Sequence, residues 1–496
     1  MTIPFTHLNK LYINGRWEAG SEGAEAIINP ATEELIGHAP AGGVAAAEAA
    51  IAAARGAFDQ GPWPWLSMAE RAAYMRRMHA ALVSRREQIA ALIVAEVGCS
   101  QMVTQVMQVD MPLGHVLKAI DRSLVTEARL IPVEAVPNPM NPGGPMILGS
   151  GSIEREPVGV VSGITGYNFP FLLNLAKVFP ALLAGNTLVL KPSPFTPYSA
   201  LLLGEIAEEI GLPKGVLNIV TGGVEVGSLL SSDPRVDLVS FTGSEAVGIS
   251  IMTQAAATLK RVHLELGGKS ALIVRADADI QAAAMGAVAG LMINAGQGCA
   301  LLTRFVVHNA VREQFVQCAR AIAGQFKVGD PSDPSVMMGP LIRESQRAKV
   351  EGLIASGLAQ GAKLVCGGGR PVGQEKGFFV DITLFDDVTN NMTIAQEEIF
   401  GPVGVVIGFD SDEEAVAIAN DSRFGLNGGV MTADPAVAYQ MARRIRAGSV
   451  YINGGGGTMP YAPIGGFKRS GIGREFGPDW LNEFTEEKTI VYPVGR

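Results

Sequence analysis

Residues 158–161 read Val158-Gly159-Val160-Val161, and similar runs recur at Thr187-Leu188-Val189-Leu190, Val216-Leu217-Asn218-Ile219-Val220, Val236-Asp237-Leu238-Val239-Ser240-Phe241 and Val262-His263-Leu264-Glu265. Each run is short and rich in strand-forming residues, and we expect helices between them. Strands that alternate with helices build a parallel sheet through crossover connections. The sequence therefore predicts an α/β fold with a doubly wound parallel sheet.

Ligand candidates follow these runs, because open α/β sheets bind ligands outside the carboxyl ends of their strands. The segment 241–248 reads as a strand end that turns into a helix, whose N-terminus would offer N–H groups to a phosphate. It lacks the usual three-glycine dinucleotide pattern, and glycines in such turns are commonly structural. Lys191 precedes the rigid Pro192, which favours a lysine positioned for a ligand over a merely solvated one.

Further elements lie on both sides of this core. Asn14-Gly15 predicts a hairpin turn, and residues 137–151, rich in proline and glycine, predict a linker or an extended arm. A second α/β unit is expected from Ser270 onward. The remaining expected elements are helices over 44–58, 69–97 and 280–293, strands over 271–274 and 305–307, and a helix through Gln325.

Composition narrows the class of protein. A chain of 496 residues should divide into two or three domains. Its net charge of −9 does not favour electrostatic binding to nucleic acid or to an anionic membrane. The apolar stretch from Ile280 to Thr303 is interrupted by Asn294 and Gly296, so we expect a buried helix there, not a membrane span. The N-terminus shows no secretory signal. Small molecules are the expected partners.

Cysteine usage indicates a reducing, cytoplasmic compartment. The four cysteines form neither a disulfide framework nor a zinc-ligand spacing, and the six histidines show no metal-ligand spacing. No metal site is expected. The four are Cys99, Cys299, Cys318 and Cys366.

Two short motifs indicate covalent chemistry. Cys299 ends the run Asn294-Ala295-Gly296-Gln297-Gly298-Cys299, where small residues would give a reagent access to the sulfur. Glu265 precedes Leu266-Gly267-Gly268-Lys269, where glycines leave a carboxylate room to move. A cysteine after an apolar helix is more often a small buried hydrophobe, and a carboxylate at a strand end is more often paired or solvated. Taken together, the motifs suggest a thiol nucleophile and a base.

Ordered motifs run along nearly the whole chain. They are Gly166-Tyr167-Asn168-Phe169-Pro170, Lys191-Pro192-Ser193, Phe241-Thr242-Gly243-Ser244, Glu265-Leu266-Gly267-Gly268-Lys269, Gly296-Gln297-Gly298-Cys299, Glu398-Ile399-Phe400-Gly401-Pro402, Pro463-Ile464-Gly465-Gly466-Phe467-Lys468 and Ser470-Gly471-Ile472-Gly473-Arg474-Glu475. In this order they resemble the motifs of the NAD(P)-dependent aldehyde dehydrogenase superfamily.

The resemblance implies a role for each matched residue. Cys299 would attack the aldehyde carbonyl to give a thiohemiacetal, and Asn168 with the Cys299 N–H would stabilise the oxyanion. Hydride transfer would leave a thioester, and Glu265 would activate the water that hydrolyses it. Lys177 matches a lysine near the active site whose role stays open.

The resemblance also implies binding residues. Those for the coenzyme are Ile164, Thr165, Tyr167, Lys191, Ser193, Gly222, Gly243, Ser244, Leu266, Glu398 and Phe400. Those for the substrate are Phe169, Leu173, Ala176, Gly298, Ala300, Thr458 and Ile464, a mostly apolar and uncharged set that favours a neutral aliphatic or aromatic aldehyde.

This sequence departs from the family pattern at two places. Pro194 stands where many NAD-preferring relatives carry a glutamate that contacts the adenosine ribose, so NAD is expected as coenzyme with NADP as the alternative. Gly166-Tyr167 replaces a frequent proline and tryptophan; the aromatic body of Tyr167 should keep the Asn168 geometry.

The resemblance implies a domain organisation and an assembly. Residues 1–136 and 158–265 would form the cofactor-binding domain, 266–463 the catalytic domain, and 137–157 with 464–496 a small β oligomerisation arm and tail of a homodimer or homotetramer. Two rival functions remain. A CoA-acylating aldehyde dehydrogenase would resolve the thioester with a thiol, against which the base Glu265 argues, and a structural or binding protein would keep the fold without turnover.

Overall fold

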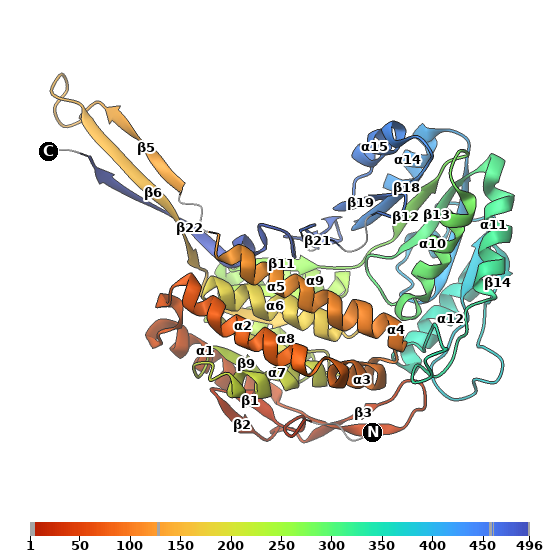
Figure 1. Cartoon of the computed structure of the whole chain (residues 1–496), viewed down its shortest axis with the longest axis horizontal. Helices are drawn as coiled ribbons and strands as arrows, with labels where there is room; N and C mark the ends of the chain where they lie inside the picture. The colour runs from red at the N-terminus through yellow and green to blue at the C-terminus, as the bar shows by residue number, and fades with distance from the viewer. Residues whose placement is uncertain (1–4, 126–128, 456–458, 460, 495–496) are drawn as a thin grey trace.

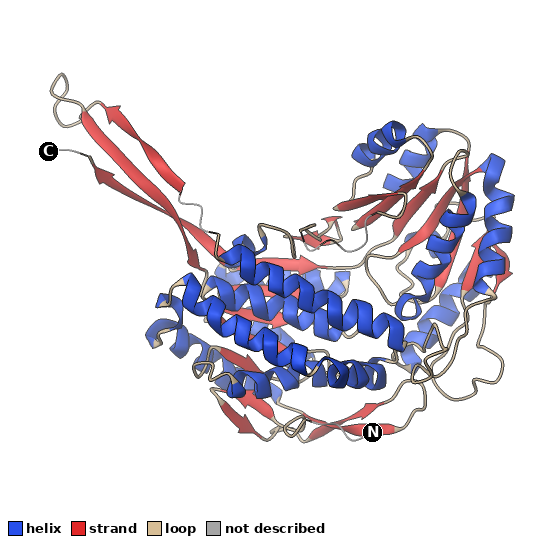
Figure 2. Cartoon of the chain, viewed as in Figure 1, coloured by secondary structure: helices blue, strands red, loops and turns tan. Residues whose placement is uncertain are grey.

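The computed structural model describes residues 5–125, 129–455, 459 and 461–494. It contains two large, mainly parallel sheets, each covered by helices, and a slender β arm that projects from the body (Figure 1). Figure 2 shows how the helices flank the strands of both sheets. The α/β class expected from the sequence is confirmed.

The first sheet has eight strands, and its centre is parallel and doubly wound. The chain moves outward from β7 through β8 to β9, then crosses back to add β10 and β11 on the other side of β7. The hairpin predicted at Asn14-Gly15 is confirmed as β1 and β2. In spatial order the strands are β2 Arg16–Glu18, β1 Leu11–Ile13, β9 Leu217–Ile219, β8 Thr187–Lys191, β7 Val160–Ile164, β10 Leu238–Thr242, β11 Arg261–Glu265 and β21 Gly471–Ile472.

Helices cover both faces of this sheet, because successive strand residues point to opposite sides. Val160 of β7 packs in one apolar cluster with α1, α8 and α9, whereas Val161 packs in the main core with the other helices. Such two-sided burial accounts for the continuous apolar runs of the central strands. The helices are α1 Gly43–Gln60, α8 Val224–Ser232 and α9 Glu245–Ala255 on the first face, and α2 Met68–Ser84, α3 Arg86–Val97, α5 Met111–Ser123, α6 Pro170–Ala184 and α7 Tyr198–Glu209 on the second.

The single helix predicted over 69–97 is wrong, because the structure has two helices there. Arg85 leaves helical geometry with φ −112° and ψ 12°. The hydroxyl of Ser84 donates to the Ala81 carbonyl at 2.8 Å, a side-chain bond that competes with the helical backbone. The apolar periodicity continues across Arg85, so the sequence pattern does not reveal the break.

The second sheet has seven strands, of which only β14 is antiparallel to its neighbour. Its strands are, in order, β14 Lys363–Cys366, β15 Thr383–Asp386, β16 Val403–Phe409, β13 Leu302–His308, β12 Ser270–Val274, β18 Asn427–Met431 and β19 Ser449–Ile452. Its helices are α10 Ile280–Met292, α11 Asn309–Ala323, α12 Glu344–Ala359, α14 Asp412–Asn420 and α15 Pro435–Arg444.

The projecting arm is a three-stranded antiparallel sheet in which β6 (Ile147–Pro157) lies between β5 (Arg129–Val136) and β22 (Thr485–Pro493) (Figure 1). The sequence assigned β5 to the cofactor-binding unit, whereas its pairing places it in the arm. The pairing register shifts between Ile131 and Glu134, around Pro132, which has no N–H to donate. The shift at Pro132 interrupts the alternation of residues that would mark this segment as a strand in the sequence.

None of the described helices combines the length and apolar character needed to cross a bilayer.

Short elements complete the fold. They are β3 Ala24–Ile28, β4 Leu35–Pro40, β17 Phe424–Gly425, β20 Phe467–Lys468, α4 Gln101–Val103, α13 Thr393–Gln396, a π-helix over Thr104–Asp110 and 3-10 turns over Trp63–Trp65, Ala256–Thr258, Ile293–Gly296 and Trp480–Phe484.

Candidate active site

The carboxyl ends of the first sheet line up at one edge. The parallel register pairs Ile164 with Lys191, and Thr242 with Glu265. The residues 266–269 then lead directly from β11 into β12 of the second sheet. Glu265 therefore lies where the two sheets join.

The Cys299 loop reaches this junction through a strained turn after α10. Asn294 and Ala295 adopt the left-handed region with φ 48° and 52°, and Gly296 follows with φ 71°. A Cβ on Gly296 would lie 2.1 Å from the Gly401 carbonyl oxygen, so no larger residue fits this turn. The apolar helix predicted over 280–293 ends one residue earlier, at Met292.

Gly268 brings the Glu265 segment against the Cys299 loop. A Cβ on Gly268 would lie 2.3 Å from the carbonyl oxygen of Cys299, a separation that only glycine permits. The close backbone approach joins the two motifs that the sequence singled out for chemistry. The same close approach explains why residue 268 is a glycine.

Cys299 is a free thiol in a partly exposed residue. Burial of the thiol, together with the nearby carboxylates of Glu398 and Glu265, raises its pKa to about 12. The sulfur is therefore protonated in this state, and a thiolate needs a base or a positive charge beside it.

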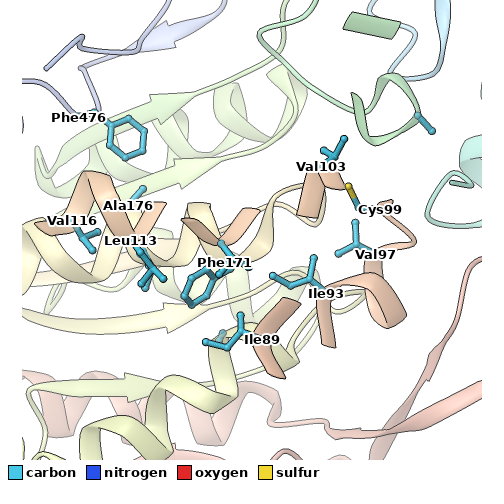
Figure 3. Close-up of a cluster of buried hydrophobic side chains, with 14 of the residues drawn as sticks. Ile89, Ile93, Val97, Cys99, Val103, Leu113, Val116, Phe171, Ala176 and Phe476 are labelled. Atoms are coloured by element: carbon cyan, nitrogen blue, oxygen red, sulfur yellow. The ribbon is translucent and has the colours of Figure 1, made fainter. Parts of the chain in front are cut away.

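Cys99, in contrast, is packed in the main hydrophobic core among Ile93, Val97 and Val103 (Figure 3). Burial raises the pKa of its thiol to about 11. A cysteine enclosed by apolar side chains behaves as a small hydrophobe. The packing of Cys99 therefore indicates a structural role.

Asn168 is hydrogen-bonded to the loop that carries Cys299. Its side-chain Nδ2 donates to the Gln297 backbone carbonyl at 2.9 Å, and its backbone carbonyl accepts from the Asn294 side-chain amide at 2.8 Å. The residue is 8% exposed. An amide donor is thus fixed beside the backbone that carries Cys299.

Glu265 is a buried carboxylate, 4% exposed, whose Oε1 has no hydrogen-bond partner among the described residues. Burial raises its pKa well above the usual value for a glutamate, and the negative charge of Glu475 adds to this effect. The cations Lys177 and Arg474 act in the opposite direction. A carboxylate with a raised pKa is suited to accept a proton near neutral pH.

Lys177, whose role was left open, forms a buried ion pair with Glu475. The lysine lies on α6 and the glutamate 298 positions later in the chain. Removal of either partner would leave a buried charge without compensation. The pair therefore fixes the surroundings of Glu265.

The expected coenzyme residues gather at the same edge. Lys191 is buried, and burial lowers the pKa of its amine to about 8, against the opposing effect of the Glu25 carboxylate. Its Nζ donates only to the Pro192 carbonyl, at 3.4 Å, within the described chain. The Ser193 hydroxyl accepts from the Phe195 N–H at 3.3 Å.

An aromatic group stands near this edge. The Tyr167 ring lies 6.2 Å from Phe195 and 5.9 Å from Phe400, measured between centroids. Its hydroxyl is buried and lacks a hydrogen-bond partner in the described part of the protein. Glu398 accepts from the Gly268 N–H at 3.0 Å, which ties it to the junction.

The other expected coenzyme residues follow the strand ends. Ser244 is the N-cap of α9 and makes no side-chain capping bond, and a Cβ on Gly243 would lie 2.4 Å from the Phe241 ring. The remaining placements are Ile164 as the last residue of β7, Thr165 with its hydroxyl donating to Asn174 at 2.8 Å, Gly222 with φ 144° after β9, and Leu266 buried after β11.

Two further residues, on α12, were missed by the sequence reasoning. Lys349 Nζ donates to the Glu398 carbonyl at 3.0 Å, and Gln346 donates to the Phe400 carbonyl at 2.8 Å. Both side chains hold the segment that carries Glu398, one of the expected coenzyme residues. Their spacing of one helical turn was the available signal, but such spacing is common on exposed helices.

The expected substrate residues divide by exposure. Gly298, Ala300, Phe169 and Ile464 are partly exposed, whereas Leu173 and Ala176 are buried. Ala176 belongs to the buried cluster shown in Figure 3. Thr458 lies outside the described residues. No group of three or more His, Cys, Asp or Glu side chains suited to a metal ion was found in the part of the chain that the structure describes.

Known proteins resemble this chain over nearly its whole length. The family model described as "Aldehyde dehydrogenase family" matches residues 17–490. A 3-succinoylsemialdehyde-pyridine dehydrogenase from a Pseudomonas species is 40% identical over 97% of this chain and 98% of its own.

Solved structures give the same result. A mutant of aldehyde dehydrogenase C from Pseudomonas syringae, in complex with NAD+ and octanal, superposes with a TM-score of 0.92 at 41% identity, covering 99% of this chain and 98% of its own. A Mycobacterium tuberculosis aldehyde dehydrogenase in complex with NAD+ has a TM-score of 0.91 at 42% identity, covering 99% of both chains. With the motifs gathered at one junction and a family model that spans most of the sequence, the chain belongs to the aldehyde dehydrogenase family.

Proposed function

We propose that this enzyme oxidises a neutral aliphatic or aromatic aldehyde to the carboxylic acid with NAD as coenzyme. The approach of Gly268 to the Cys299 carbonyl carries the proposal, because it places a thiol and a carboxylate without a hydrogen-bonded Oε1 at one junction. The expected substrate residues that are partly exposed, Gly298, Ala300, Phe169 and Ile464, carry no charge, which favours a neutral substrate. The similar enzyme from Pseudomonas syringae was crystallised with octanal, an aldehyde of this class.

The residues at the carboxyl edge fit a dinucleotide. Lys191 has a single weak acceptor, the Tyr167 hydroxyl has none among the described residues, and Ser244 leaves the first turn of α9 without a side-chain cap. Ribose hydroxyls and a pyrophosphate would satisfy these groups. When bound, the nicotinamide ring supplies the hydride acceptor. Because similar structures hold NAD+, NAD is placed ahead of NADP, although Pro194 removes a carboxylate that would repel a 2′-phosphate.

The proposed chemistry starts at Cys299 and oxidises one aldehyde to the acid for each NAD+ reduced. The Cys299 thiol first gives up its proton to water, the resulting thiolate adds to the aldehyde carbon, and the Asn168 amide and the Cys299 N–H stabilise the oxyanion. Loss of hydride converts the thiohemiacetal to a thioester. Glu265 then takes a proton from water while the water oxygen forms a bond to the acyl carbon and the carbon–sulfur bond breaks. Aldehyde, NAD+ and water become acid, NADH and a proton.

An aldehyde panel with NAD and NADP in parallel, followed at the absorbance of the reduced nicotinamide, tests this proposal. We expect turnover without added coenzyme A, faster with NAD, on uncharged aliphatic or aromatic aldehydes. Activity that starts only when coenzyme A is added would favour the acylating rival instead. No activity under either condition would favour a binding role without turnover.

We also propose that the arm joins copies of this chain into a homodimer or homotetramer. A three-stranded sheet without covering helices has no core of its own, and its strands expose Leu130 (70%), Val133 (58%) and Val491 (71%). A second copy would cover them. We expect light scattering to give a dimer or tetramer mass, and Leu130→Asp with Val491→Asp to shift it to the monomer; a monomeric wild-type chain would contradict the proposal.

A further inference from the structure

His263 and Glu265 lie on the same face of β11, because residues two apart in a strand point to the same side. Both are almost fully buried, at 1% and 4% exposed. His263 Nε2 lies 4.0 Å from Glu265 Oε1, and neither atom has a hydrogen-bond partner among the described residues. Two unsatisfied polar atoms thus face each other next to the site, just beyond bonding distance.

Ser240 can pair with the tautomer of His263 that carries its proton on Nε2, and the nearby Glu265 carboxylate makes this tautomer the favoured one. The Ser240 hydroxyl lies 3.1 Å from His263 Nδ1, and the two residues are paired across β10 and β11. A hydroxyl that donates to Nδ1 leaves the ring proton on Nε2. The opposite tautomer would point a lone pair of Nε2 at the Glu265 carboxylate. The favoured form therefore directs an N–H donor toward that carboxylate.

The imidazole ring is held in place. A Cβ on Gly473 would lie 2.2 Å from the His263 ring carbon Cδ2, and Phe484 meets the ring edge to face at 6.3 Å between centroids. Since the ring is confined, the bond is completed by movement of the Glu265 side chain. A shift of about 1 Å brings the two atoms to hydrogen-bond distance.

Charged groups from several elements surround the pair. Burial keeps the pKa of His263 well below its usual value, and the cations Lys177, Arg474 and Arg261 lower it further. The ring is thus neutral at working pH and acts as a donor without a charge. The same Lys177 and Arg474 lower the pKa of Glu265, while burial, Glu475 and Glu483 raise it.

We propose that His263 is a positioning residue, which donates its Nε2–H to the Glu265 carboxylate and keeps the base ionised and correctly placed for the attacking water. This inference rests on the proposed role of Glu265. Nothing in the Cys299, Asn168 and Glu265 motifs requires a histidine at this position.

The test compares two amide variants of His263 in the intact enzyme. Asparagine places its N–H near the Nδ1 position of histidine, whereas glutamine reaches the Nε2 position. Without the donor, the Glu265 carboxylate is less stable and binds a proton more readily, so the acid limb of the steady-state pH profile moves to higher pH. We expect His263→Asn to move it by about one pH unit, and His263→Gln to restore most of the wild-type profile.

A second readout separates this role from a general loss of structure. The pre-steady-state burst of NADH precedes hydrolysis, so both variants should keep its rate and amplitude. Ser240→Ala, which removes the partner of Nδ1, should move the acid limb in the same direction by less. Ser162→Ala is the matched control, because it alters another buried serine, on the adjacent strand β7, whose hydroxyl has no described partner.

An unchanged acid limb in His263→Asn, or equal profiles for the Asn and Gln variants, would overturn the inference. If His263→Asn does not fold, an unchanged limb in Ser240→Ala would overturn it as well. Failure of the proposed function gives a different result. Full steady-state turnover in Glu265→Gln would show that Glu265 is not the general base. Loss of turnover in Glu265→Gln with an unchanged His263→Asn profile removes only the role of His263.

Discussion

The two large sheets approach the site through opposite edges. The eight-stranded sheet presents the carboxyl ends of its strands, with Lys191 as the last residue of β8 and Glu265 as the last of β11. The seven-stranded sheet presents its amino ends, with Cys299 in the loop before β13 and Lys269 directly before β12. The rule that ligands bind at carboxyl ends describes only the first sheet.

This difference places the base and the nucleophile on different edges. The first edge supplies the base and most of the groups that fit a coenzyme, whereas the coenzyme candidates Glu398 and Phe400 precede β16 of the second sheet. The second edge supplies the nucleophile from a loop that three consecutive left-handed residues turn sharply, Asn294, Ala295 and Gly296. Strain of this kind persists where the surrounding structure imposes it, and it is frequent at functional sites.

The largest effect is expected at the second edge. Cys299→Ala removes the nucleophile, so aldehyde-dependent NADH production should fall by at least about 10³-fold. Binding of NAD, measured by quenching of protein fluorescence, should stay within twofold, because Cys299 is not among the residues expected to bind the coenzyme. Cys318→Ala is the control, since this half-buried cysteine lies on α11. Equal turnover in wild type and Cys299→Ala would reject the assigned nucleophile.

The junction between the edges is the next point to test. Gly268→Ala introduces a methyl group where only 2.3 Å separates the Cβ position from the Cys299 carbonyl oxygen, so the two edges must move apart. We expect kcat/KM to fall by about 10²-fold, the usual cost of misplacing reacting groups by about 1 Å. Gly286→Ala on α10, where the added Cβ meets open space, should keep full activity. A Gly268→Ala enzyme as active as this control would show that the close approach is dispensable.

A smaller effect is expected at the first edge. Lys191→Ala removes a buried amine that has one weak acceptor among the described residues, so it should raise KM for NAD by about tenfold, the value of one lost hydrogen bond to a charged group. The kcat at saturating NAD should change little, because the reacting groups are untouched. Steady-state kinetics at varied NAD give both constants. An unchanged KM for NAD would exclude Lys191 from coenzyme binding.

The sequence could predict the first sheet because its strands are short apolar runs with clear ends. Each expected run between residues 158 and 265 overlaps a strand of the structure. The break at Arg85 and the irregular strand around Pro132 were not predictable from periodicity, since both depend on local backbone geometry.

The candidate site was predictable in its motifs but not in its contacts. Gly268, Cys299 and Asn168 belong to quoted motifs, whereas Lys177 and Glu475 are separated by 298 positions and meet only in the folded chain. His263 carried no signal either. A histidine within a strand is usually a buried structural residue, and only the unsatisfied atoms around it indicate another role.

The covalent intermediate is tested most directly by intact-protein mass spectrometry of Glu265→Gln mixed with aldehyde and NAD. Without the base, the thioester should accumulate, so we expect a mass increase equal to the acyl group less the thiol hydrogen that it replaces, located on the Cys299 peptide, together with a burst of NADH close to one per active site. NADH production without any acyl mass on Cys299 would contradict a thioester mechanism at this residue.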